Sequence, residues 1–253
     1  MKTVVSITNP ILIVMIIGHL IGDFYLQSDK LVEKRKTGIG YLFLHSLIYA
    51  ICMSTVVLLC IPISIESIKL SASLSLIHLM IDLVKHIISS IYNKHNQNAQ
   101  NSKILNILVF FIDQALHIIS IGFCYKFICP NMIARSFLQY NINTISSSPL
   151  VIILGILLIL RPVDIIISKL VFETQSTDKT GKIIGYLERI IIFILLQFGA
   201  YSSIAFVLTA KSIARFKAIE ENEGRAKYYL IGTLISTSSV IIISFVLGLC
   251  GQP

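Results

Sequence analysis

The sequence predicts an all-α fold, a polytopic transmembrane helix bundle of about seven spans. Hydrophobic residues make up 55% of the 253 residues, and the mean hydropathy is +0.83. Only 13% of the residues are charged, whereas soluble domains carry about a quarter. The apolar residues also form stretches near the length of ~20 residues that crosses a bilayer. These observations exclude an ordinary soluble domain, and the net charge of +8 then belongs to membrane loops rather than to a nucleic-acid site.

Residues 1–128 contain four of the expected spans, and we treat them as one four-helix membrane bundle. The start resembles a signal peptide, but it has no small-residue cleavage motif and is expected to remain as the first span. A connector at 29–40 with four basic residues separates the first two spans, and an asparagine-rich connector at 93–103 separates the last two. The four apolar stretches run over 9–28, 41–61, 68–91 and 104–128.

Residues 129–253 are expected to form a carboxy-terminal membrane region of about three spans, over 149–172, 183–209 and 228–249. Basic loops favour the cytoplasm, so the connector at 29–40 places the amino terminus outside. The same alternation would put the basic residues of 211–227 outside, against that rule. The topology after residue 149 therefore stays open.

Histidine and aspartate recur four residues apart inside the apolar stretches of the first half. The three pairs are His19 with Asp23, His78 with Asp82, and Asp113 with His117, and His45 is a fourth histidine in a span. Helical neighbours at this spacing lie ~5 to 6 Å apart, close enough to bind one metal ion or relay one proton. Ionisable groups within membrane spans are costly and indicate function.

The depths of these residues in their spans agree with one another. With a helical rise of ~1.5 Å per residue, each lies within roughly 10 to 24 Å of a basic connector on the same side. Four helices could therefore bring four imidazoles and three carboxylates to one buried point. Imidazole with carboxylate suits zinc, iron or manganese, and seven donors fit either two ions or one ion with carboxylates that orient the histidines. The expected metal residues are His19, Asp23, His45, His78, Asp82, Asp113 and His117, and the aspartates are also the expected catalytic groups.

The second half carries a weaker set of charged residues. Arg161, Lys182, Glu188 and Arg189 are candidates for binding a phosphate or a lipid headgroup, although basic residues at span ends commonly serve only as topology anchors. The five cysteines form no C-x-x-C pair, so no thiolate zinc site is expected.

Several strings resemble a known family. HLIGDFYLQ at 19–27, LIHLMIDLVK at 76–85 and FIDQALH at 111–117 resemble the bacterial and phage membrane family catalogued as domain of unknown function 3307. The resemblance brings no established activity. The HL-x-x-D pattern is also similar to the membrane-bound metal-dependent hydrolases of the YdjM type, although this chain lacks their paired histidines at the second motif.

Three functions are then compatible with the sequence. The first is a metal-dependent hydrolase that acts on a lipid or lipid-linked (phospho)ester at the cytoplasmic leaflet of a bacterial inner membrane. The second is a divalent-cation or proton-coupled transporter, because ionisable side chains in spans also mark ion pathways. The third is an assembly or signalling partner with a structural metal site. The expected partner is a membrane lipid or lipid-linked substrate, nucleic acid is not expected, and a homo-oligomer stays open.

Overall fold

The described part of the chain consists of helices joined by short turns. The computed structural model describes residues 10–35, 38–95, 103–128, 149–171, 179–214, 216 and 223–249, and these residues contain no strand. They fall into two compact units, 10–128 and 149–249, which we call the amino-terminal and carboxy-terminal units. The all-α prediction is confirmed.

The first helix of the amino-terminal unit changes its winding near its end. Helix α1 (Pro10–Leu20) begins with a proline, which suits the first helical position because no hydrogen bond is lost there. It continues as the π-helix η1 (Ile21–Tyr25), in which the Leu26 amide donates to the Ile21 carbonyl at 2.9 Å. The π-helix ends at Tyr25. Ser28 then caps the short helix α2 (Asp29–Lys34).

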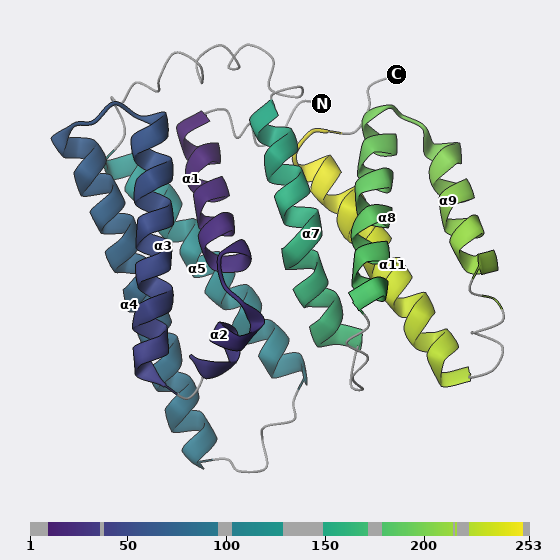
Figure 1. Cartoon of the computed structure of the whole chain (residues 1–253), viewed down its shortest axis with the longest axis horizontal. Coiled ribbons are helices and arrows are strands. Elements are labelled where there is room, and N and C mark those ends of the chain that lie inside the picture. The colour runs from purple at the N-terminus through teal and green to yellow at the C-terminus, as the bar shows by residue number, and fades with distance from the viewer. Residues whose placement is uncertain are drawn as a thin grey trace. The chain divides into compact units, whose positions relative to one another are not determined.

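Three long helices complete the amino-terminal unit: α3 (Ile39–Cys60), α4 (Ile65–His95) and α5 (Lys103–Ile128). Helix α3 ends just before Ile61, because Pro62 disfavours the helical conformation in the residue before it. Helix α3 packs on α1 and α4, and α5 packs on α4 and α1 (Figure 1). Helices α3, α4 and α5, together with α1 and η1, therefore form a closed bundle around one interior.

Two glycines allow α1 and η1 to approach α3 closely. A Cβ atom on Gly22 would lie 2.9 Å from Cδ2 of Tyr49, and one on Gly18 would lie 3.1 Å from Cγ1 of Val56. Real side chains do not tolerate the first distance, so an alanine at position 22 would displace the Tyr49 ring. Glycine at this position thus fixes where Tyr49 lies in the bundle.

The carboxy-terminal unit contains α7 (Pro149–Val171), α8 (Lys179–Gln197), α9 (Tyr201–Ala214) and α11 (Glu223–Val246). Helix α11 packs on α7 and α8, and α8 packs on α9. The stretch 183–209, expected to be one span, is divided between α8 and α9. The cause is Gly199, whose φ of 64° ends α8, with the Ala200 amide donating to the Leu195 carbonyl at 2.9 Å.

Among the described residues, five helices are long and apolar enough to cross a membrane, so this is an integral membrane protein. They are Ile39–Cys60, Ile65–Tyr92, Ile107–Ile128, Pro149–Leu170 and Tyr229–Val246. Two further apolar helices are shorter, Pro10–Tyr25 and Tyr201–Ala214. Many large apolar side chains of the long helices are exposed, as lipid-facing residues would be.

Candidate metal centre

The amino-terminal unit brings together all seven histidines and aspartates that the sequence singles out. They come from every long element of the bundle: His19 ends α1, Asp23 lies in η1, His45 lies on α3, His78 and Asp82 lie on α4, and Asp113 and His117 lie on α5. None of the seven is more than 7% exposed. The three pairs spaced four residues apart, and His45, therefore meet in one buried cluster although they come from distant parts of the chain.

His78 lies at the centre of this cluster. Its ring centroid is 4.4 Å from that of His117, 5.3 Å from that of His45 and 6.2 Å from that of His19. Its Nε2 lies 3.9 Å from Oδ1 of Asp23. The two carboxylates nearest to it are joined by another imidazole, because His45 Nε2 lies 3.3 Å from an oxygen of Asp23 and 3.3 Å from an oxygen of Asp82.

The donor atoms form three overlapping groups, in each of which all ligand atoms lie within 4.8 Å of one another. The groups are His19, Asp23 and His78; His45, His78 and Asp82; and Asp82, Asp113 and His117. Because His78 belongs to the first two groups and Asp82 to the last two, neighbouring groups share a ligand. This overlap suits either one ion or two adjacent ions.

Two histidines have one ring nitrogen engaged and the other turned into the cluster. His117 Nδ1 donates to the Asp113 carbonyl at 3.1 Å, and His19 Nε2 donates to Oε1 of Gln114 at 3.3 Å. Their remaining nitrogens, Nε2 and Nδ1, are then lone-pair acceptors. Metal-binding histidines in proteins usually show this pattern, since the bonded N–H fixes the tautomer and the ring orientation.

The free nitrogens are buried without a hydrogen-bond partner. Among the described residues the same is true of both ring nitrogens of His78 and of Oδ1 of Asp113. A buried polar atom left unsatisfied costs ~1 to 3 kcal/mol, so a cluster of them indicates an ion or ordered water as the missing partner. The residues present therefore fit a metal ion.

Gln114 and Gln27 orient the Asp23 carboxylate. Gln114 Nε2 donates to Oδ2 of Asp23 at 3.0 Å, and Gln27 Nε2 donates to Oδ1 at 3.2 Å. Because Gln114 also accepts from His19, one amide connects α5 to two donors on α1 and η1. The sequence interpretation missed Gln114, although its position three residues before His117 puts it on the same helical face.

Tyr49 supports the central histidine and was also missed. Its ring stacks on that of His78, with centroids 3.5 Å apart and planes 20° apart. The available signal was its spacing, since Tyr49 lies four residues after His45 and so shares its face. The close approach at Gly22 then connects η1, through Tyr49, to His78.

Two cations border the cluster on its more exposed side. Lys85 Nζ lies 2.6 Å from Oδ2 of Asp113, and Arg35 Nη1 lies 3.7 Å from Oδ2 of Asp82. With neutral imidazoles, three carboxylates and two cations leave one uncompensated negative charge. Burying a net negative charge is costly, so this charge favours a bound cation among the carboxylates.

The four second-half candidates lie in the carboxy-terminal unit and are held differently. Arg189 is 2% exposed, its Nη2 lies 3.9 Å from Oδ1 of Asp164, and Glu188 accepts a hydrogen bond from Lys211. Lys182 is exposed near the start of α8, and Arg161 is half-buried on α7. Glu188 and Arg189 are therefore engaged inside their own unit, and headgroup binding by this set stays a prediction.

Comparison with known families gives one match. Residues 11–146 match the family described as "Protein of unknown function (DUF3307)", and the matched range includes all seven clustered residues with Gln27, Arg35, Tyr49, Lys85 and Gln114. No curated protein and no solved structure matches the chain. The resemblance to this family is confirmed, whereas the likeness to YdjM-type hydrolases stays a prediction.

Proposed function

This chain belongs to the DUF3307 family, and we propose that it is an intramembrane metal-dependent hydrolase acting on a lipid or lipid-linked (phospho)ester. The observation that carries the proposal is the set of buried imidazole nitrogens and carboxylate oxygens that face one another without hydrogen-bond partners. The membrane is taken to be a bacterial inner membrane with the amino terminus outside. The cluster then faces the cytoplasmic leaflet, because the basic connector after η1 lies on that side.

The proposed ligands are drawn from the four histidines and three aspartates of the cluster. Imidazole with carboxylate favours zinc, iron or manganese, and the shared ligands of the three groups allow one or two ions. A metal of this kind supplies Lewis acidity and lowers the pKa of a coordinated water to ~7. His19 and His117 already hold the tautomers that such a role requires.

Asp113 is the proposed general base. Lys85 contacts its Oδ2, whereas its Oδ1 is buried and has no hydrogen-bond partner among the described residues. This oxygen takes a proton from the attacking water. The water oxygen forms the new bond to phosphorus or to the acyl carbon, the ester bond breaks, and the departing alkoxide receives the proton held by Asp113 and leaves as the alcohol.

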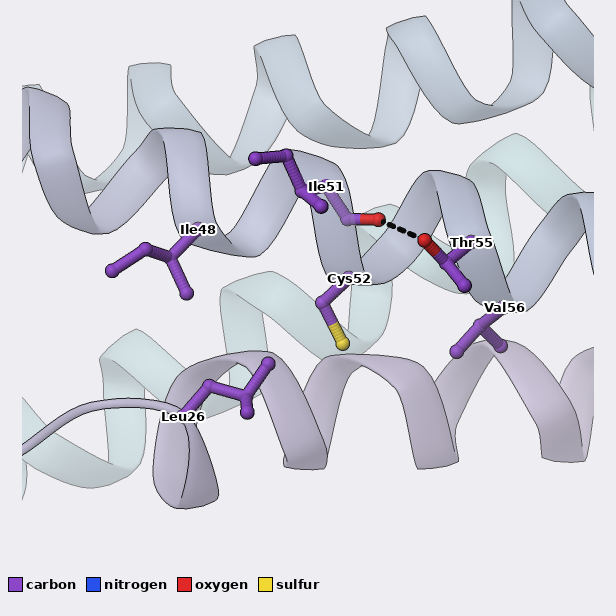
Figure 2. A pocket seen from close by; sticks show the side chains of 6 residues that line it. All are labelled: Leu26, Ile48, Ile51, Cys52, Thr55 and Val56. Atoms are coloured by element: carbon purple, nitrogen blue, oxygen red, sulfur yellow. Dashed lines mark hydrogen bonds between the residues drawn. The ribbon is translucent and has the colours of Figure 1, made fainter.

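An apolar pocket beside the cluster supports an amphiphilic substrate. It measures about 460 Å³ and is lined by Leu26, Ile48, Ile51, Cys52, Thr55 and Val56. Figure 2 shows Leu26 on one side and Cys52 on the other, at the boundary of η1 and α3. The lining is adjacent to the cluster, since Leu26 precedes Gln27 and Cys52 donates to the carbonyl of Gly18, beside His19. We assign it to an acyl chain of the substrate.

Elemental analysis of detergent-purified protein tests the proposal first. Wild-type protein is expected to carry one or two equivalents of zinc, iron or manganese, and His19→Ala/His78→Ala protein is expected to lose them. Metal-loaded protein is then assayed for release of alcohol from lipid esters in mixed micelles. Turnover should vanish in Asp82→Ala and in His117→Ala. Active protein whose turnover is unchanged in both variants would refute the hydrolase.

A second function has one observation in its favour. Transporters commonly place their ion sites at irregular helix segments within the membrane, and η1 carries Asp23 in a π turn. Proteoliposome uptake of manganese or zinc that vanishes in His19→Ala, without any ester cleavage, would favour transport over hydrolysis.

A further inference from the structure

We propose that Arg35 and Lys85 form a phosphate clamp at the opening of the metal centre, so that the ester cleaved there is a phosphoester. This inference rests on the proposed hydrolase function and narrows its substrate class. Neither residue is a candidate metal ligand, and each contacts a carboxylate of the cluster from outside. The clamp would hold the phosphate oxygens that do not take part in bond cleavage.

The two cations are more exposed than the cluster residues that they contact. The side chains of Arg35 and Lys85 are 19% and 33% exposed, whereas none of the seven cluster residues exceeds 7%. They come from different elements, since Arg35 follows α2 and Lys85 lies on α4, one turn after Asp82. A phosphate group that contacted both side chains would therefore be held by two separate elements of the fold.

The charge balance favours an anion once metal is bound. Without metal, the cluster and its two cations carry one net negative charge if the histidines are neutral. One divalent ion makes this one positive charge, and two ions make it three. A phosphodiester or phosphomonoester offsets that charge, whereas a carboxylic ester is neutral and leaves it uncompensated in a largely buried site.

The clamp residues are also suited to phosphate by their own chemistry. The arginine guanidinium donates two parallel hydrogen bonds to phosphate oxygens, and the lysine ammonium acts as a point charge. In the structure they contact Asp82 and Asp113, which are candidate metal ligands. Metal bound to these carboxylates would weaken their ion pairs with Arg35 and Lys85. Both cations would then be available to bind the substrate.

Phosphate binding by metal-loaded protein tests the clamp. Inorganic phosphate is titrated into wild-type, Arg35→Met and Lys85→Met protein in detergent, and metal content is measured on the same samples. Lys34→Met is the matched control, because Lys34 is an exposed neighbour that lies over the Tyr41 ring rather than at the cluster. A second titration uses phosphatidic acid in mixed micelles, with diacylglycerol as the uncharged comparison.

The expected result is a loss of at least tenfold in phosphate affinity for each clamp variant, with metal content and the Lys34→Met control unchanged. Tighter binding of phosphatidic acid than of inorganic phosphate would assign the clamp to a lipid headgroup, and equal binding would assign it to a soluble phosphoester. Unchanged phosphate affinity in metal-containing Arg35→Met protein would overturn the clamp and leave the metal centre intact. If the Lys85→Met protein does not accumulate, the phosphate affinity of the Arg35→Met protein alone tests the clamp. Wild-type protein that takes up no metal would overturn the proposed hydrolase, and the clamp with it.

Discussion

Replacing His78 with alanine should weaken metal binding far more than replacing His86, the other histidine on the same stretch of α4. His78 belongs to two of the three donor groups, and its ring is the nearest imidazole to those of both His45 and His117. Structural zinc sites bind with ~10 to 16 kcal/mol, so each of four ligands contributes ~2.5 to 4 kcal/mol. One lost ligand should therefore raise the dissociation constant ~100- to 1,000-fold.

The assay is competition for zinc or manganese against a chelating dye, with elemental analysis of the same samples. His86→Ala is the matched control, because His86 lies two turns further along α4, is half-buried and belongs to none of the three groups. His78→Gln preserves side-chain volume and separates lost coordination from lost packing against Tyr49. The reasoning is refuted if His78→Ala binds metal like wild type, or if His86→Ala loses as much affinity.

Three further predictions test other parts of the structure. Gln114→Leu removes the amide that orients His19 and Asp23, and should weaken metal binding ~10- to 100-fold in the same dye competition, whereas Gln197→Leu in the other unit should not. Ile51→Trp fills the apolar pocket and should raise KM for long-chain but not short-chain esters; Ile88→Trp, at an equally exposed site on α4, should leave both unchanged. Gly155→Ala brings a Cβ to 2.7 Å from Phe193 and should destabilise the carboxy-terminal unit by ~1 to 3 kcal/mol in thermal unfolding. Gly122→Ala meets nothing within 4 Å and should not destabilise, so equal effects of the two glycine changes would contradict the packing argument.

The meeting of the seven histidines and aspartates could be predicted from the sequence because each of their pairs is a local pattern. A spacing of four residues fixes the helical face, and distance from a basic connector fixes the depth, so His19 and Asp113 could be expected to meet. Gln114 carries no charge and makes its contacts to chain segments more than ninety residues away. Its role depends on how α5 is rotated against α1, which no local pattern specifies.

Two other features were beyond sequence reasoning for different reasons. Arg35 lies in a connector whose basic residues were sufficiently explained by membrane orientation, so its contact with Asp82 had no separate signal. The turn between α8 and α9 lies within a continuous apolar stretch, where a single glycine such as Gly199 is common in membrane helices and does not by itself predict a break.

The π turn at Ile21–Tyr25 has a consequence for insertions and deletions in this family. A π turn contains one residue more than an α turn, and each residue of an α-helix rotates the chain by ~100°. Deleting one residue from η1 and restoring regular winding would therefore keep the residues that follow η1 near their present face, whereas regular winding at the present length would turn them by ~100°. A single deletion should accordingly be tolerated better than substitutions that abolish the π turn without changing the length of the segment.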